Sequence, residues 1–333
     1  MPPVCTKKLA TVDAVQSASV ASVVPRTTRS ILVAVGLLLT FMSTTAVARA
    51  GDPSRVEWSP DWPRFRVSEA IGLVPLTAAS LTFALAVTPP TRPRLRGGIL
   101  LDDWIRDGLR GRTLATQRAA QDIGTYVYYA SVPVPLIVDV GIVALGVHND
   151  SDVALQMLLI DAQALGMSGV VSLGAEHIGG RQRPYVQDCD PDGRVRSPSG
   201  ELLNNHCGSV NDNESLVAGH AAAVTTMAGL TCVHHQHLPL YGGGLADLAP
   251  CVFMMGAAGF TGVSRIVADK HWASDVLLGW AVGSLSGYVV PSLLHYGFTR
   301  GDPPGPTRGK TAAWMPVPVV YPGGAGLGVF GLL

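Results

Sequence analysis

The chain of 333 residues is 47% hydrophobic and only 14% charged, a composition typical of membrane proteins rather than of water-soluble domains. Its 24 Lys and Arg residues balance its 24 Asp and Glu residues, so the formal net charge is zero. The chain therefore lacks the excess positive charge with which proteins attract nucleic acid, and we do not expect nucleic-acid binding.

Residues 1–50 have the composition of a signal peptide or an N-terminal anchor. Basic residues precede the apolar run 31–42, and Ala48-Arg49-Ala50 is similar to the small-residue sites at which signal peptides are cleaved. We favour a cleaved signal. Two alternatives stay open: the segment is an uncleaved anchor, or Met42 is the true start and the preceding stretch is not translated.

Residues 51–69 are expected to form an interfacial segment before the first span. Trp58, Trp62 and Phe65 lie here beside arginines, a combination typical of the headgroup level of a bilayer. We therefore place this segment along the membrane surface.

Residues 70–296 contain successive apolar segments of about twenty residues, the length with which a helix crosses a hydrocarbon layer of roughly 30 Å. Glycine, alanine and serine are frequent within them, and small residues allow membrane helices to pack closely. The pattern predicts an all-α, polytopic membrane bundle of about six transmembrane helices. The expected spans are 70–88, 123–147, 153–174, 215–233, 245–263 and 273–296.

The connection between the first two spans contains a candidate surface helix within residues 102–118. Such a helix would be amphipathic, with Trp104, Ile105 and Leu109 toward lipid and its arginines outward. A solvated basic linker is an equally good interpretation of this stretch.

The most informative stretch is Ser264–Asp275, which sets an arginine, a histidine and an aspartate around the start of the last span. If a helix begins near His271, Asp275 lies one turn further on the same face, within reach of the imidazole. A carboxylate that holds Nδ1–H leaves Nε2 of His271 as a nucleophile toward phosphorus. Arg265 is placed to bind the phosphate oxygens and to stabilise the transition state without a metal ion.

His220 is the candidate proton donor to the leaving oxygen and, afterwards, the base that activates water. Gly219 before it would let backbone amides approach an anion closely, and a helix that starts nearby would add the positive end of its dipole. Arg183, followed by Pro184, would complete a cluster of cations, with Arg181 as a further member. We therefore expect one phosphate site where membrane helices end.

These residues resemble the signatures of the superfamily of type 2 phosphatidic acid phosphatases and vanadium haloperoxidases, over about residues 70–296. Its first signature is a lysine, six residues and Arg-Pro, and its second is Pro-Ser-Gly-His. Its third, which is Ser-Arg, five residues, His, three residues and Asp, is complete here in Ser264–Asp275. The resemblance is to the membrane lipid phosphatase branch.

The resemblance implies a role for each candidate residue. His271 would be the nucleophile with Asp275 as its partner, and His220 would be the general acid and base. Arg183 and Arg265 would bind the phosphate. The resemblance also implies six spans around a helical core, and catalysis without a metal ion or another cofactor.

Two departures from the family pattern bear on activity. Glu176 stands where the first signature has its lysine, and its negative charge would repel a phosphate unless it is protonated or turned away. The second signature reads Val217-Ala218-Gly219-His220, so the serine hydroxyl is missing. His177 and Arg181 are the candidates to replace the lost cation.

The polar, glycine-rich insert 185–213 lies between the first two signatures, where a substrate would enter, and suits a lid or specificity loop. Cys189 and Cys207 bracket most of it, and the sequence is equally compatible with a disulfide and with two free thiols. Cys232 and Cys251, inside apolar segments, are expected to be unpaired.

The last turns of the span that follows His220 carry the cluster Cys232, His234, His235 and His237. These are soft-metal ligand types, but a second ligand pair is lacking, so we do not expect a metal site.

Asp139 and Asp161 fall within spans, where an ionised carboxylate is costly. Hydrogen bonding between helices is the favoured explanation for both. Pairing with arginines at helix ends and a place in the wall of a cavity are the alternatives. Residues 297–333 are rich in proline and glycine and form a predicted C-terminal tail without an expected role.

Orientation in the membrane has two incompatible interpretations. Counting spans from a cleaved signal puts the catalytic end inside the cell together with the arginine-rich stretch 92–118, as the distribution of positive charge favours. The resemblance and a Cys189–Cys207 disulfide favour a catalytic end that faces the periplasm of a bacterial-type inner membrane. We adopt the second interpretation.

The predicted function is an integral membrane phosphatase that hydrolyses a lipid phosphate or a polyprenyl diphosphate through a phosphohistidine intermediate. A catalytically weakened member that binds lipid phosphates or partner proteins is the alternative, because of Glu176. Vanadate-dependent halide oxidation is disfavoured, because those relatives are generally soluble and use the missing lysine. The expected partners are the substrate and membrane lipids, and the oligomeric state stays open.

Overall fold

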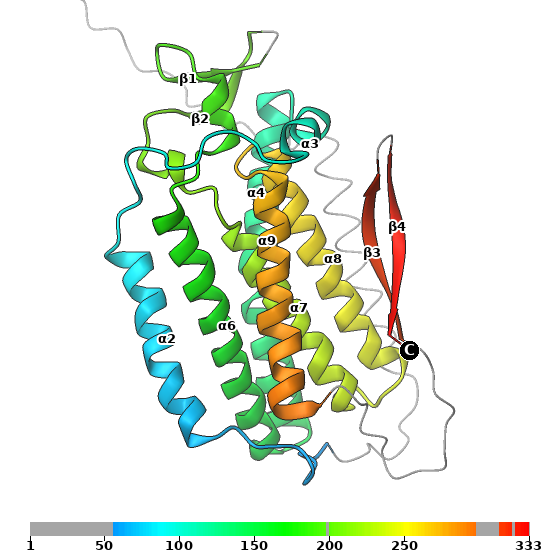
Figure 1. The fold of residues 1–333 in the computed structure, drawn as a ribbon. Helices are drawn as coiled ribbons and strands as arrows, with labels where there is room; N and C mark the ends of the chain where they lie inside the picture. The colour runs from blue at the N-terminus through cyan, green and yellow to red at the C-terminus, as the bar shows by residue number, and fades with distance from the viewer. Residues whose placement is uncertain (1–55, 198–199, 298–312, 322–323, 333) are drawn as a thin grey trace, which may run out of the picture. The chain divides into compact units, whose positions relative to one another are not determined.

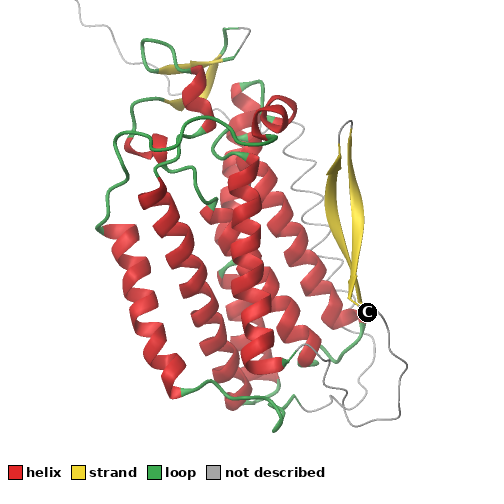
Figure 2. Cartoon of the chain, viewed as in Figure 1, coloured by secondary structure: helices red, strands yellow, loops and turns green. Residues whose placement is uncertain are grey.

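The computed structural model describes residues 56–197, 200–297, 313–321 and 324–332. Within them, long helices lie side by side and two short pairs of antiparallel strands accompany them (Figures 1 and 2). The predicted all-α membrane class is confirmed. The predicted signal or anchor, residues 1–50, lies outside the described residues.

The helical elements are α2 (Val67–Leu85), α3 (Asp102–Leu109), α4 (Leu114–Ser131), α5 (Pro133–Pro135), the π-helical η2 (Leu136–Val147), α6 (Ser151–Gly179), the 3-10 turns η3 (Pro184–Asp188) and η4 (Val210–Asn213), α7 (Gly219–His237), α8 (Leu245–Val267), α9 (Ala273–Ser284), and the π-helical η5 (Leu285–Val289) and η6 (Ser292–Tyr296). The strands are β1 (Arg194–Arg196), β2 (Leu202–His206), β3 (Ala313–Tyr321) and β4 (Gly324–Leu332).

Five helical segments in the described part of the chain are long and apolar enough to cross a membrane. They are Val67–Leu85, Leu114–Val147, Ser151–Gly179, Leu245–Val267 and Ala273–Tyr296. Helix α2 buries none of its residues, so its apolar side chains face outward, as they do in contact with lipid. The chain is a multi-pass membrane protein.

The sixth expected span, 215–233, is α7, which is not apolar enough to count as a span by itself. Most of α7 is buried, because α4, α6, α8 and α9 all pack against it. A helix enclosed by other helices has little contact with lipid, so threonines and histidines can occur along it without being exposed to lipid. This enclosed helix begins at the candidate catalytic residues.

Helix α7 packs closely against α9 and η5 along a row of glycines spaced four residues apart, Gly279 and Gly283 in α9 and Gly287 in η5. A methyl group added at Gly279 would lie 2.8 Å from the carbonyl oxygen of Ala218, and one added at Gly283 would lie 2.6 Å from that of Ala222. Because these neighbours are backbone atoms, only glycine fits. The close contact holds the start of α9 against the start of α7.

Part of the expected interfacial segment packs against the rest of the protein. Trp58 is only 7% exposed, its ring lies 5.2 Å from that of Tyr296, and Val56 is fully buried. The indole Nε1–H of Trp58 donates to the carbonyl oxygen of Trp62. Burial of large aromatic surfaces makes this segment part of the protein core at the end of the last span.

Helix α3 forms where the amphipathic helix was expected, and the alternative of a solvated linker is wrong. Trp104 is 53% exposed, as predicted, but the expectation of outward arginines fails for Arg106. Arg106 is buried and donates to both carboxylate oxygens of Asp269, each at 2.7 Å, and to Asp188. Helix α3 is therefore tied to the connection between α8 and α9.

Two disulfides occur in the described residues. Cys189 is bonded to Cys207 within the insert, where β1 and β2 pair. Of the two alternatives that the sequence left open, the disulfide is therefore confirmed, and two free thiols are excluded. Cys232 of α7 is bonded to Cys251 of α8, so the prediction that these two are unpaired is wrong. The error arose because both lie in apolar segments, and the sequence does not show that α7 and α8 bring their Cα atoms to 4.5 Å.

The predicted tail contains an antiparallel hairpin that the sequence analysis did not anticipate. Strands β3 and β4 pair from Ala313 with Leu332 to Tyr321 with Gly324. Proline and valine alternate at residues 316–319 of β3, and the prolines argued against a strand.

Candidate active site

The candidate residues come together because four helix ends meet at one end of the bundle. Helix α6 ends at Gly179, α7 begins at Gly219, α8 ends at Val267 and α9 begins at Ala273. Gly180 follows α6 with a φ of 60°, a left-handed conformation that suits glycine and turns the chain across the bundle. Two hydrogen bonds join the ends: Ala218 N–H to the Asp275 carbonyl, and the Trp272 indole to the Gln182 carbonyl.

His271 is buried with a defined tautomer. Its Nδ1 lies 2.8 Å from the carbonyl oxygen of Ser215, and because a carbonyl only accepts, Nδ1 carries the proton. Nε2 therefore has a free lone pair. Burial lowers the pKa of His271 well below its usual value, and the charges of Arg183 and Arg265 lower it further. The predicted nucleophile is thus held as a neutral imidazole between two guanidinium groups.

Asp275 does not bond directly to His271, which corrects the predicted pair. One carboxylate oxygen, Oδ1, accepts from Arg181, and the other, Oδ2, accepts from the Ser215 hydroxyl at 2.6 Å and from Trp272 N–H. The connection therefore runs through Ser215, whose carbonyl accepts from His271 and whose hydroxyl donates to Asp275. Asp275 positions the segment that holds the imidazole rather than the imidazole itself.

Arg181 is not available to a substrate, so its predicted role in phosphate binding is wrong. It is 1% exposed, and its guanidinium donates to Asp275 at 2.5 Å and to Asp102 at 2.7 Å. It also donates to the hydroxyl of Ser274 at 2.7 Å. Asp102 lies in α3 and Asp275 lies in α9, so Arg181 links these two helices.

Arg183 and Arg265 have the unsatisfied donors that a phosphate site requires. The Nε atom of each is buried and, among the described residues, has no hydrogen-bond partner. Arg265 donates only through Nη1 to the Thr125 hydroxyl, and Arg183 has a loose ion pair with Glu214 at 3.6 Å. Buried donors without partners are costly, so an anion that accepts from both arginines would stabilise the site.

His220 and Gly219 lie in the first turn of α7. The imidazole packs on the ring of Tyr128, with ring centres 4.4 Å apart, and neither ring nitrogen has a hydrogen bond with a described residue. The backbone amide of Gly219 is occupied by Glu176, whose Oε1 lies 3.2 Å from the amide nitrogen. The predicted anion site at this helix start therefore already holds a carboxylate of the protein.

Ser215 and Lys270 lie next to the candidate residues but were not predicted from the sequence. Ser215 precedes the second signature and has no signal of its own, because its role arises from contacts with residues about sixty positions away. Lys270 lies directly before His271 in a variable position of the third signature. Burial, together with the charges of Arg183 and Arg265, lowers the pKa of Lys270 to about 8, so this lysine lies near the two arginines.

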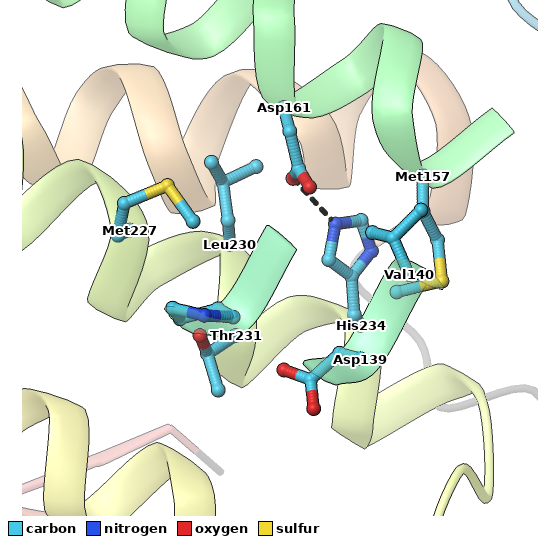
Figure 3. Close-up of a pocket in the computed structure, with 9 residues that line it drawn as sticks. Asp139, Val140, Met157, Asp161, Met227, Leu230, Thr231 and His234 are labelled. Atoms are coloured by element: carbon cyan, nitrogen blue, oxygen red, sulfur yellow. Dashed lines mark hydrogen bonds and ion pairs between the residues drawn. The ribbon is translucent and has the colours of Figure 1, made fainter. Parts of the chain in front are cut away.

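A second group of buried polar residues lies toward the far end of α7 (Figure 3). Asp161 accepts from Nε2 of His234 at 2.8 Å, and Asp139 accepts from the hydroxyl of Tyr241. The predicted hydrogen bonding between helices is thus confirmed for Asp161, whereas Asp139 bonds to a residue of the loop between α7 and α8. Neither carboxylate pairs with an arginine of the described residues. Both also line a narrow cavity with no room for a water molecule.

The side chains of the cluster Cys232, His234, His235 and His237 do not point toward a common metal position. Cys232 is in a disulfide, His234 bonds to Asp161, and Nδ1 of His235 lies 2.7 Å from Asp247. In the part of the chain that the structure describes, no three side chains of His, Cys, Asp or Glu are arranged to hold a metal ion.

A cavity of about 240 Å³ lies between the insert and the loop after α2, and Gln182, the neighbour of Arg183 in the chain, lines it. Its lining is polar and mostly uncharged. The lining residues are Thr91, Pro93, Gln182, Val186, Gly208, Ser209, Asp212 and Asn213. The insert that was expected at the substrate entrance therefore forms part of a cavity wall next to Arg183.

Part of the chain is similar to known proteins. A family model described as PAP2 superfamily matches residues 157–298. A lipid A 1-phosphatase of Porphyromonas gingivalis is 32% identical over 157 residues, which are 46% of this chain and 27% of that relative. The chain thus spans about a quarter of the length of this curated relative.

A solved structure is also similar. The transmembrane PAP2 type phosphatidylglycerolphosphate phosphatase of Bacillus subtilis aligns over 78% of this chain and 94% of that chain, with a TM-score of 0.35 and 17% identity. The stretch that the family model matches contains all the predicted site residues from Arg181 to Asp275. Residues 157–298 are thus similar to the PAP2 superfamily over the stretch that carries the candidate site.

Proposed function

We propose that this protein is a membrane phosphatase that hydrolyses a lipid phosphate or a polyprenyl diphosphate through a phosphohistidine intermediate on His271. The observation that carries the proposal is the hydrogen bond from Nδ1 of His271 to the Ser215 carbonyl, which leaves the Nε2 lone pair free. The unpartnered Nε donors of Arg183 and Arg265 supply the anion-binding part of the same site.

The reaction has two steps. In the first, Nε2 of His271 forms a bond to phosphorus while the bond from phosphorus to the lipid oxygen breaks, and protonated His220 gives its proton to that oxygen. In the second, His220 takes a proton from water, the hydroxide attacks phosphorus, and the bond to Nε2 breaks. Inorganic phosphate leaves and both histidines return to their starting states. Arg183 and Arg265 stabilise the charge on the phosphate oxygens in both steps, and no metal ion takes part.

The family and the fold support a lipid-borne substrate. The matched relative is a lipid A 1-phosphatase, and the site of this chain lies at the ends of membrane helices, where a headgroup phosphate would reach it. The polar cavity beside Arg183 would take the group that carries the phosphate.

Glu176 favours a second candidate function. Its carboxylate accepts from the Gly219 amide at the start of α7, which is the group that a phosphate oxygen would otherwise occupy. A member in which this carboxylate stays in place would bind lipid phosphates weakly, or partner proteins, without turnover.

Release of inorganic phosphate tests the proposal. Detergent-purified protein would be assayed with phosphatidic acid, phosphatidylglycerol phosphate and undecaprenyl diphosphate, beside His271→Ala and His271→Gln variants that retain the wild-type melting temperature. We expect release from at least one lipid that both variants lose. If the wild type releases no more phosphate than the variants from any of the three, the binding function is favoured, and Glu176→Lys becomes the variant to assay.

A further inference from the structure

Lys270 is the only lysine in the part of the chain that the structure describes, and it directly precedes His271. It is half-buried, in the short connection between α8 and α9. Its ammonium lies 5.3 Å from the centre of the Tyr185 ring, on the insert side of the site. A cation over an aromatic face is held there without losing its charge or its ability to donate hydrogen bonds.

The carboxylates near Lys270 are already engaged elsewhere. Asp269 accepts two hydrogen bonds from Arg106, and Asp212 accepts from the hydroxyls of Tyr185 and Ser209. Among the described residues, no carboxylate forms an ion pair with the ammonium of Lys270. This lysine thus has positive neighbours, Arg183 and Arg265, and no dedicated counter-ion.

The charges around the reacting histidine are unbalanced in a way that a phosphate would correct. Arg183, Arg265 and Lys270 contribute three positive charges, while Glu176 and Glu214 are the carboxylates closest to Arg183. Neither substitute that the sequence suggested for the missing lysine is free. Arg181 is held by two aspartates, and His177 uses Nδ1 to bond the Leu173 carbonyl.

We propose that Lys270 is a substrate-binding residue that donates to the non-bridging oxygens of the substrate's phosphate, as the third cation of the site. It would supply the charge that the family's first signature places at the position of Glu176. This inference rests on the proposed phosphatase site and names a further residue within it. The chemical class of the ligand is a phosphate group, whether it is borne by a lipid or free in solution.

The kinetic test compares two substitutions. In Lys270→Gln we expect KM for a lipid phosphate to rise about 10- to 100-fold, the effect of losing one hydrogen bond from a charged donor. In Lys270→Arg the charge remains, so KM should stay within a few-fold of the wild type. A structural role for the lysine would instead lower kcat or the melting temperature in both variants, and that result would overturn the inference.

The pH dependence separates the wild type from Lys270→Arg. Because the pKa of Lys270 is lowered to about 8, the free site loses this positive charge as pH rises through that value. KM of the wild type should therefore increase above about pH 8, whereas Lys270→Arg keeps its charge and should show a flatter profile. Parallel profiles in the two proteins would contradict the inference.

A chemical experiment tests the inference without turnover. The wild type would be treated briefly with acetic anhydride, and acetylation of Lys270 would be quantified by mass spectrometry in millimolar inorganic phosphate and in sodium chloride of equal ionic strength. We expect phosphate, and not chloride, to slow acetylation several-fold. A lipid phosphate in mixed micelles would show whether the lipid-borne group protects as well as the free ion does.

The outcomes distinguish this inference from the proposed function. If the protein hydrolyses lipid phosphate but phosphate does not slow acetylation and Lys270→Gln has an unchanged KM, the role of Lys270 is refuted and the phosphatase stands. If phosphate protects Lys270 but no substrate is hydrolysed, Lys270 is an anion ligand in a protein that binds phosphate without turnover.

Discussion

At the scale of single residues, two arginines that are only two positions apart in the chain have different surroundings. Arg181 is enclosed by Asp102, Asp275 and Ser274, whereas Arg183 has a loose ion pair and a buried Nε donor without a described partner. The first is therefore structural, and the second is open to an anion. A substitution at each should affect different measurements.

For Arg181→Gln we expect a loss of stability of about 3 to 5 kcal/mol, because Asp102 and Asp275 would be left buried without their counter-charge. Thermal unfolding in detergent measures this as a lower melting temperature. Arg194→Gln is the matched control, since the side chain of Arg194 is 53% exposed and should contribute little. Equal melting temperatures for the two variants would contradict the assignment of Arg181.

For Arg183→Gln we expect the opposite pattern. The melting temperature should change little, because Glu214 is the only ion-pair partner that the described residues provide. KM for the phosphate substrate should rise roughly tenfold or more, because one charged donor to the phosphate is lost. Steady-state phosphate release measures both parameters, and an unchanged KM would show that Arg183 does not contact the substrate.

The acid side of the pH profile tests the state of His271. Its pKa is lowered in the folded protein, chiefly by burial, so the neutral imidazole persists to a lower pH than in a free histidine. We therefore expect kcat/KM to be retained as pH falls through about 6.5, the usual pKa of histidine. A halving of kcat/KM near that pH would show that His271 is protonated in the ordinary range and is a poor nucleophile there.

At the scale of elements, helix α3 and the glycine row of α9 determine how accurately the helix ends meet. Arg106 of α3 bonds to Asp269, Asp102 of α3 bonds to Arg181 and Ser274, and both contacts reach the connection that carries His271. The sequence shows α3 as a polar-faced helix but not which of its charges point inward, because the partners lie far along the chain.

The glycine row gives a prediction for the pair α7 and α9. Gly283→Ala would place a methyl group 2.6 Å from the Ala222 carbonyl oxygen, and backbone atoms cannot move aside as a flexible side chain does. We expect a loss of about 1 to 3 kcal/mol, the usual cost of overpacking, together with lower phosphatase activity, because the starts of α7 and α9 shift apart.

Gly256→Ala in α8 is the control for this prediction. A methyl group there meets nothing within 4 Å, and alanine favours a helix by up to about 1 kcal/mol over glycine, so stability should not fall. Melting temperatures of the two variants in the same detergent give the comparison. A similar decrease in melting temperature in both variants would contradict the prediction that Gly283 is required for the close approach of α7 and α9.

At the scale of the whole molecule, the open question is which side of the membrane carries the site. The Cys189–Cys207 disulfide lies in the insert at the catalytic end, and disulfides persist in oxidising compartments. We therefore keep the expectation that the catalytic end faces the periplasm rather than the cytoplasm, although the arginine-rich loop argues for the reverse orientation.

Labelling of single cysteines tests the orientation. In a Cys5→Ser background, a cysteine in place of Arg112 marks the catalytic end, since the neighbouring Gly111 bonds to the last residue of α8. A cysteine in place of Leu245, which is 82% exposed, marks the opposite end. We expect a membrane-impermeant maleimide to label the first in cells whose outer barrier alone is opened, and the second only after the inner membrane is permeabilised. The reverse pattern would establish a cytoplasmic site.

The sequence by itself determined the membrane class, five of the six predicted spans and the choice of His220 and His271 as candidate catalytic residues. Hydropathy is a local property of about twenty residues, and the third signature lies within the twelve residues Ser264–Asp275, so neither needs knowledge of distant contacts. Even α7, which is too polar to count as a span alone, was predicted as the apolar segment 215–233.

Only the tertiary structure decided what each charged side chain does. Arg181 and Arg183 look equivalent in the sequence, but Arg181 is enclosed by carboxylates 79 and 94 positions away, and His271 is oriented by a carbonyl 56 positions away. Cys232 and Cys251 are paired because α7 and α8 pack together, and Lys270 lies over the Tyr185 ring because the insert folds against it. Electrostatic roles depend on which groups surround a charge after folding, and that is set by packing between segments that no local pattern relates.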